Sequence, residues 1–135
     1  MARRKELAAN ERKEAMKTTY IASLRNVPTS PRKMRLVADI VRGKEVFQAL
    51  NILRFTNKEA AGRLEKLLRS AIANYEKKSG NVAQADNLFI KTVMVDGATQ
   101  LKRISAAPQG RAHRIRKRSN HVTMVLGELT NDQNN

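Results

Sequence analysis

The residues whose types and spacing indicate a chemistry lie between positions 101 and 118, in the stretch LKRISAAPQGRAHRIRKR. Positive side chains occupy both ends of this stretch, with no acid among them: Lys102, Arg103, Arg111, Arg114, Arg116, Lys117 and Arg118. Its centre holds small or turn-forming residues: Ser105, Ala106, Ala107, Pro108, Gln109 and Gly110. Because so many like charges repel one another unless phosphate neutralises them, the stretch predicts a two-stranded arm that binds a polyanion.

Catalytic and metal-binding chemistry has no comparable support. The two histidines, His113 and His121, lie eight residues apart, the chain has no cysteine, and no carboxylate pair stands beside them. A helical two-histidine metal site needs a spacing of four. We therefore expect no enzyme activity, no metal and no cofactor. We interpret each histidine as a polar strand residue, with RNA contact as a second interpretation for His113.

The charge balance narrows the class of partner. The 135 residues include 27 Lys and Arg against 12 Asp and Glu, which gives a net charge of +15 and an isoelectric point near 11.0. This imbalance favours nucleic acid or an anionic membrane. Because no apolar run is long enough to span a bilayer and the N-terminus lacks the apolar core of a signal peptide, we expect a soluble protein. A membrane partner is not expected, because the arm lacks the apolar face of a membrane-surface binder.

Stacking on unpaired bases is disfavoured as a binding mode. No aromatic residue lies within residues 101–118, and single-stranded binders rely on aromatic platforms. Contacts with the phosphates and 2′-hydroxyls of a folded RNA, or insertion into a groove, fit the composition better. Arginine also exceeds lysine in this stretch, which suits bidentate recognition of phosphate.

The body that must hold the arm begins with a strand over residues 18–27 and a basic helix. Ser30 and Pro31 predict the start of that helix, with the Ser30 hydroxyl as its cap, and Gly43 predicts its end. Its apolar face carries Met34, Val37, Ala38, Ile40 and Val41. Its other side is mostly cationic and carries Arg32, Arg35, Asp39 and Arg42. Two interpretations of this side stay open, a solvated face with an Arg35–Asp39 ion pair or direct contact with phosphate.

Two further helices complete the predicted body. One covers residues 45–55, and the capping-box spacing of Thr56 and Glu59 announces another that ends before Gly80. With 41% hydrophobic residues, the chain can build one modest core, so we expect a single domain over residues 18–128. Residues 1–17 are interpreted as a flexible, solvated extension, with a second RNA-contacting tail as the alternative, and residues 129–135 as a flexible tail.

Two apolar, β-branched runs flank the basic stretch, at residues 88–95 and 120–126. Asp96-Gly97 is a strong hairpin signal that would fold the chain straight back after the first run. We favour a bulge at Gly97 and one long hairpin over about residues 88–126, because the short hairpin would lay basic side chains beside the core. The tip then falls at about residues 105–111.

A hairpin of this length must project from the body. From Gly97 to the tip it spans roughly 33 Å, whereas a globule of this size has a radius of gyration of about 14 Å. Its apolar side chains are too few to build a core, and isolated ribbons are marginal in water. We therefore predict that the arm is mobile in the free protein and becomes ordered on its partner.

Several strings of the chain resemble the bacterial type of large-subunit ribosomal protein number twenty-two, over about residues 20–128: SPRKMRLVADIVRGK, ALNILRFTNKEAA, SAIANYE and LKRISAAPQGRAHRIRKRSNHVTMVL. The resemblance implies an α+β fold, with three helices packed on a small antiparallel three-stranded sheet and a long protruding β-hairpin. It implies a structural constituent of the large ribosomal subunit in the cytoplasm, which supports subunit assembly and lines the peptide exit tunnel with its hairpin tip. The implied partners are large-subunit ribosomal RNA, neighbouring proteins around the tunnel exit and the nascent peptide, with no homo-oligomer.

The resemblance and the charge pattern together define the expected RNA-binding set: Arg32, Lys33, Arg35, Arg42, Lys91, Lys102, Arg103, Arg111, His113, Arg114, Arg116, Lys117 and Arg118. The expected tunnel-lining tip is Ser105, Ala106, Ala107, Pro108, Gln109 and Gly110. Family members usually carry an arginine at the tip, whereas this tip is small and neutral, which suits lining a passage. The first seventeen residues have no obvious family counterpart. A DNA-bending architectural protein is the alternative function, because basic β-arms with a proline near the tip also fit a minor groove.

Overall fold

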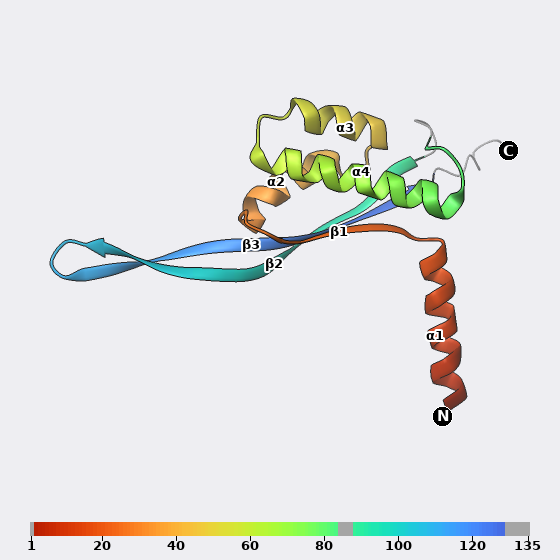
Figure 1. The fold of residues 1–135 in the computed structure, drawn as a ribbon, viewed down its shortest axis with the longest axis horizontal. Helices are drawn as coiled ribbons and strands as arrows, with labels where there is room; N and C mark the ends of the chain where they lie inside the picture. The colour runs from red at the N-terminus through yellow and green to blue at the C-terminus, as the bar shows by residue number, and fades with distance from the viewer. Residues whose placement is uncertain (1, 84–87, 129–135) are drawn as a thin grey trace.

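The computed structural model describes residues 2–83 and 88–128, which form four helices and three strands. The helices are α1 (Ala2–Lys17), α2 (Pro31–Val41), α3 (Val46–Phe55) and α4 (Glu59–Ser79), and the strands are β1 (Tyr20–Val27), β2 (Leu88–Ala107) and β3 (Arg111–Glu128). Helices α2, α3 and α4 lie on one side of the sheet, and β2 and β3 continue beyond them as a long arm (Figure 1). The predicted α+β fold, with three helices on a three-stranded antiparallel sheet and a protruding hairpin, is confirmed.

Two helices end at glycines with a left-handed backbone. Gly43 follows α2 with a φ of 73°, and Gly80 caps α4 with a φ of 72°, so both predicted helix ends are confirmed. Two predicted caps are wrong. Ser30 occupies the N-cap position of α2, but its side chain makes no capping bond. The Thr56 hydroxyl donates backwards to the carbonyl of Ile52 at 2.6 Å, so Thr56 ends α3 and does not cap the next helix.

The core lies between the helices and the covered face of the sheet. Strand β3 is central, in the order β1-β3-β2, and α4 packs mainly over β1 while α2 packs mainly over β2. Side chains of a strand alternate between its faces, so every second residue at the body end of β3 is buried. The large side chains that are fully buried include Met34, Leu64, Leu68, Leu88, Ile90 and Met124. Ile40, predicted for the core, is instead 42% exposed, because it lies at the margin of the apolar face of α2.

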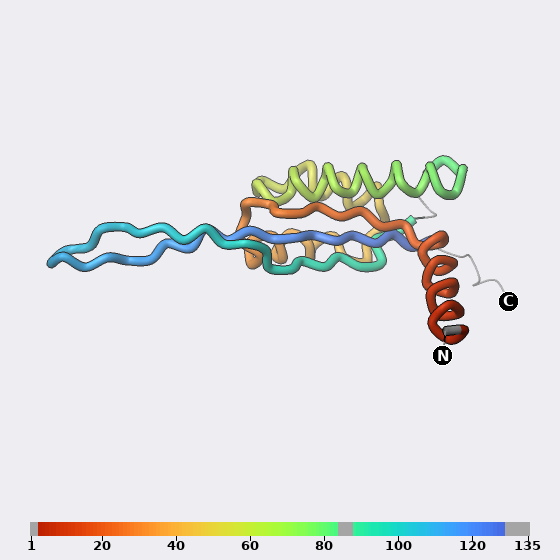
Figure 2. Tube along the Cα trace, turned by 60° about the horizontal axis from the view of Figure 1, so that its bottom comes forward, coloured from red at the N-terminus to blue at the C-terminus, as the bar shows by residue number. Residues whose placement is uncertain are grey.

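The arm is one continuous two-stranded ribbon. Strands β2 and β3 pair from Leu88 and Glu128 at the body to Ala107 and Arg111 near the tip. The register shifts just after Gly97, so this glycine marks a bulge and not the turn of a short hairpin. Beyond the bulge the ribbon extends well past the helices, as Figure 2 also shows from another side. The prediction of one long hairpin is confirmed.

Residues 2–17, interpreted from the sequence as a flexible extension, form helix α1, which stands off from the body (Figure 1 and Figure 2). The C-terminal end of α1 is held by α4, because the ammonium of Lys78 donates to the carbonyls of Met16 at 3.2 Å and Thr19 at 2.9 Å. The flexibility of this segment in solution stays a prediction. The predicted tail at residues 129–135 lies outside the described residues. None of the helices found in residues 2–83 is long and apolar enough to cross a membrane.

Tyr20 closes the sheet at the end away from the arm. Its hydroxyl donates to the Glu128 carboxylate at 3.0 Å, and its ring meets the ring of Tyr75 edge-on, with centroids 4.7 Å apart. Burial of the phenol, followed by this hydrogen bond to a carboxylate, raises the pKa of Tyr20 above its ordinary value. The folded state therefore favours the neutral phenol.

Candidate nucleic-acid interface

The register of the arm places its positive side chains on both faces of the ribbon. Residues opposite each other in antiparallel strands share a face, and the two faces alternate along each strand. One face, here the Arg114 face, carries the pairs Gln100–Arg118, Lys102–Arg116, Ile104–Arg114 and Ala106–Ala112. The other, the Arg103 face, carries the pairs Leu101–Lys117, Arg103–Ile115, Ser105–His113 and Ala107–Arg111. The seven predicted cations of the arm are all exposed, four on the first face and three on the second.

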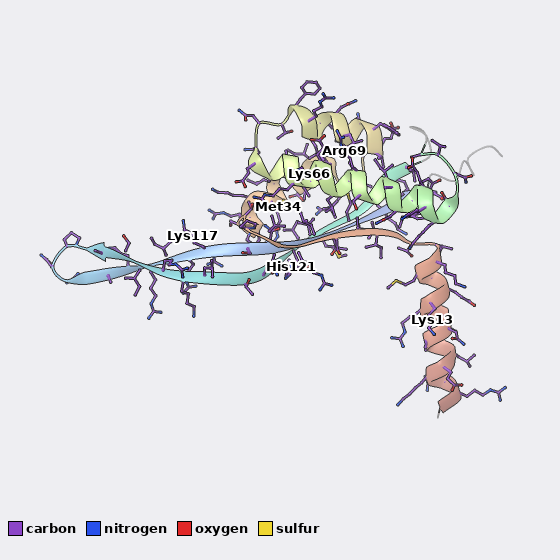
Figure 3. The ribbon with its side chains drawn as sticks, in the orientation of Figure 1. Lys13, Met34, Lys66, Arg69, Lys117 and His121 are labelled. Carbon is purple, nitrogen blue, oxygen red and sulfur yellow. The ribbon has the colours of Figure 1, made fainter. Side chains whose placement is uncertain are left out.

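The charge of the arm is not balanced within the protein. Lys102 and Arg116 stand directly opposite each other, and a like-charge pair in this position destabilises a ribbon. The sequence has no acid between positions 97 and 120, and within residues 88–128 no salt bridge involves the arm. Figure 3 shows side chains extending from both sides of the arm, with Lys117 labelled on β3. An external polyanion bound along the arm would offset this repulsion.

The start of α2 lies beside the root of the arm, the part of β2 and β3 near Gly97 and Arg118 where the ribbon leaves the body. A hollow of about 560 Å³ is lined there by Ser30, Pro31, Arg32, Arg35, Gly97 and Arg118. A second hollow, of about 550 Å³, is lined by Pro28, Ser30, Leu101, Arg116, Lys117, Arg118 and Ser119. Arg118 borders both hollows. Because the free amides at a helix start carry partial positive charge, both are electrostatically favourable for phosphate.

The position of the arm's root depends on Asn120, which sequence reasoning missed. Asn120 is fully buried, and its Nδ2 donates to the carbonyl of Thr29 at 2.6 Å. It is also opposite Gly97 in β2 and Val27 in β1. Asn120 thereby ties the loop before α2 to the root of the arm. The signal in the sequence was an amide at an inward-facing position, two residues before the buried Val122.

Two predicted RNA-binding residues of α2 have partners inside the protein. Arg35 donates to the carbonyl of Val95 from Nε at 3.2 Å and from Nη2 at 2.9 Å, and Arg42 donates from Nη2 to the carbonyl of Val93 at 3.1 Å. Both carbonyls belong to β2, an edge strand whose outward groups have no strand partner. Asp39 pairs with Arg42 at 2.8 Å, so the Arg35–Asp39 pair of the solvated-face interpretation is wrong. One role of both arginines is to cover the edge of the sheet.

Other predicted residues lie apart from the root of the arm. Lys33 borders a separate hollow on the α4 side, and Lys91 borders one at the opposite end of the sheet. His113 is exposed on the Arg103 face. His121 accepts a hydrogen bond at Nδ1 from the amide of Asn26 at 3.0 Å, which confirms its interpretation as a polar strand residue. Within the part of the chain that the structure describes, no group of three His, Cys, Asp or Glu side chains is placed to hold a metal.

The tip of the arm is small and uncharged. Pro108, Gln109 and Gly110 connect the two strands, and the last two take left-handed φ angles of 63° and 72°. A three-residue hairpin loop commonly uses such a backbone, which glycine adopts without strain. The first cation after the turn is Arg111. The positive charge therefore lies on the two strand segments of the arm, residues 101–107 and 111–118, here called its shafts, and not on the connecting loop.

An exposed arm with two basic faces, mounted on a small helical and β-sheet body, defines a structural protein suited to holding a polyanion. Comparison with known proteins gives the family: the protein-family model described as "Ribosomal protein L22p/L17e" matches residues 22–127 of this chain. The chain belongs to this ribosomal-protein family. It is a structural component and not an enzyme, as predicted.

Three relatives illustrate the similarity, each named large ribosomal subunit protein uL22. The chain is 61% identical to that of Flavobacterium johnsoniae over an alignment of 137 positions, which covers 100% of this chain and 99% of the relative. It is 60% identical to that of Porphyromonas gingivalis over 134 residues, covering 99% and 100%, respectively. It is 59% identical to that of Bacteroides fragilis over 133 residues, covering 98% of each.

The same comparisons correct the view of the N-terminal extension. The family model begins at residue 22, after α1. The Flavobacterium johnsoniae relative, however, matches 100% of this chain. The first seventeen residues therefore do have counterparts within the family, and the expectation that they lack one is wrong.

Proposed function

We propose that this protein is a structural constituent of the large ribosomal subunit and that its arm binds large-subunit ribosomal RNA. The observation that carries the proposal is the presence of exposed cations on both faces of the arm. An arm lying on the surface of an RNA needs charge on one face. Charge on both faces suits a passage between RNA segments, where phosphates neutralise each face. The names of the relatives support the same subunit.

The anchoring begins at the root of the arm. Arg32 and Arg118 border the same hollow at the start of α2, so a phosphate placed there meets two guanidinium groups and free helix amides. Further out, the cations of the shafts contact phosphates and 2′-hydroxyls, since the arm offers no aromatic side chain for stacking. Lys33 and Lys91 lie off this path, and we propose them as peripheral phosphate contacts.

The tip lines the peptide exit tunnel in this proposal. Ala106, Ala107 and Pro108 are small and neutral, so they leave room for a nascent peptide and attract no phosphate. The chain has no cysteine, so a Pro108→Cys variant can be labelled at the tip alone. In assembled, empty subunits we expect this thiol to react with a small maleimide, because the tip faces an open passage. A thiol fully protected in the assembled subunit would contradict the tunnel-lining role.

Co-sedimentation tests the proposed function as a whole. We expect the full-length protein to follow large subunits through a sucrose gradient at moderate salt and to support subunit assembly together with neighbouring proteins. A DNA-bending architectural protein would follow the nucleoid fraction instead. Loss from large subunits together with recovery in the nucleoid would overturn the ribosomal proposal.

A further inference from the structure

Helix α1 carries a charge pattern that the proposed function of the arm does not use. Residues 3–17 contain six cations and three acids: Arg3, Arg4, Lys5, Arg12, Lys13, Lys17, Glu6, Glu11 and Glu14. At about 100° per residue, all three acids fall on one half of the helix. Lys5 and Arg12 follow the centre line of the opposite half, with Arg4 and Lys13 at its margins. This acid-free half extends along the length of α1.

The acid-free half has the composition of a phosphate-binding face and not of a protein interface. Its cations are separated by Ala8, Ala9, Ala15 and Met16. The two large apolar side chains of α1 divide between the halves: Leu7, 58% exposed, lies on the acidic half, and Met16, 63% exposed, lies at the C-terminal end of the acid-free half. Protein interfaces have apolar and often aromatic centres, whereas the centre line of this half carries Lys5 and Arg12. Because it has no aromatic side chain, double-stranded RNA fits better than unpaired bases.

The side chains in and beside α1 bond to carbonyls of the helix: Arg12 Nε donates to Ala8 at 3.0 Å, and the Thr19 hydroxyl donates to Ala15 at 2.6 Å. The helix has 16 residues, and its first turn contains no acid, so the cations of that turn oppose the helix dipole. No salt bridge of the described residues involves residues 3–17. Isolated helices shorter than about 12–15 residues are marginal in water, and α1 is only slightly longer than this limit. A polyanion along the acid-free half would offset the charge repulsion and favour the helical state.

We propose that α1 is a second RNA-binding element, whose acid-free half lies against the phosphates of an RNA duplex. The arm and α1 lie at opposite ends of the sheet (Figure 1), so the two elements hold separate segments of RNA. The bonds from Lys78 to the carbonyls of Met16 and Thr19 fix the base of α1 to the body. The proposal rests on the ribosomal function proposed above but not on the contacts of the arm.

A matched pair of double variants tests this assignment. Lys5→Gln with Arg12→Gln removes two charges from the acid-free half, whereas Arg3→Gln with Lys17→Gln removes two from the acidic half of the same helix. Affinity of each full-length variant for purified large-subunit ribosomal RNA is measured between 50 and 200 mM KCl. We expect the first variant to reduce the size of the salt slope by about 1.4 to 1.8 and the control to leave the slope nearly unchanged. Glutamine keeps the helix propensity close to that of lysine and arginine.

Each outcome decides the proposal. Equal reductions of the salt slope in both variants would mean that the net charge of α1 acts without a preferred face. Unchanged slopes in both variants would mean that α1 does not bind RNA. Either result overturns the proposal. Cross-links from Lys5 to a protein neighbour in assembled subunits, with an unchanged slope, would assign α1 to a protein partner instead. Deletion of residues 2–17 separates this proposal from the function of the arm. The truncated protein is expected to keep the arm's contribution to the salt slope. A truncated protein whose RNA affinity does not depend on salt would instead show that the function proposed for the arm is wrong.

Discussion

The two charged faces of the arm predict an effect that a one-sided arm would not show. Two triple variants remove the same charge from opposite faces. The first carries Arg114→Gln, Arg116→Gln and Arg118→Gln, and the second carries Arg103→Gln, Arg111→Gln and Lys117→Gln. All six side chains are exposed and lie outside the core. Both variants are therefore expected to fold with an unchanged thermal midpoint.

The magnitude follows from counterion release. Each phosphate contact contributes about −0.9 to the slope of log affinity against log salt for a duplex, and about −0.7 for a single strand. Seven engaged cations on the arm then give a slope of about −5 to −6, and the loss of three reduces its size by about 2 to 3. Raising the salt concentration from 50 to 200 mM is therefore expected to weaken RNA binding by each variant roughly 20- to 40-fold less than binding by the unmodified protein.

Filter binding of full-length protein to purified large-subunit ribosomal RNA provides the assay, with the thermal midpoint as the control for folding. We expect the two triple variants to lose similar slopes, because the proposed passage places RNA against both faces of the ribbon. A full reduction for one face and none for the other would show an arm lying on the surface of the RNA. That result would refute the reasoning from the register.

Three further predictions concern the body. Leu68→Ala, at a fully buried position, is expected to lower the free energy of unfolding by about 2–5 kcal/mol in urea titrations. Gly80→Ala, at a φ of 72°, is expected to lower it by about 1 kcal/mol, whereas Gly62→Ala in the interior of α4, where an added Cβ meets no atom within 4 Å, should not lower it. Because the pKa of Tyr20 is raised in the folded state, its contribution to stability is present below pH of about 10 and is lost as the pH rises towards the folded pKa. Tyr20→Phe is expected to flatten this alkaline decline in thermal midpoints, and an unchanged decline would contradict the assignment to Tyr20.

Local chemistry in the sequence was sufficient for much of the fold. Gly43 and Gly80 could be assigned as helix ends, because a left-handed backbone at a helix end favours glycine. Gly97 could be assigned to a bulge, because charge argued against the competing hairpin. Thr56 misled, since its spacing to Glu59 fits a capping box while its hydroxyl is already bonded to the preceding turn. Such competition between two local bonds is not visible in spacing alone.

The site was less predictable where it depends on distant partners. In the sequence, Arg35 and Arg42 belong to a cationic helix face with no indicated backbone partner. In the structure they donate hydrogen bonds to the carbonyls of Val95 and Val93 at the edge of the sheet. Their partners are backbone groups, which leave no signal in side-chain pattern. The role of Asn120 likewise depends on a long-range bond to a carbonyl. By contrast, the projection of the basic stretch as an exposed arm was predicted from sequence, because its charge density argues against burial. Its binding to RNA stays a prediction.

The most direct test of the central claim is the accessibility of the two faces of the arm within the assembled large subunit. Because the chain has no cysteine, Ile104→Cys and Ile115→Cys introduce single thiols on opposite faces of the arm, at neighbouring cross-strand pairs outside the tip. Their rates of reaction with a small maleimide are measured in the free protein and in the subunit. We expect both thiols to react rapidly in the free protein and both to be strongly protected in the subunit. Protection of one face alone, with the other as reactive as in the free protein, would contradict an arm enclosed by RNA.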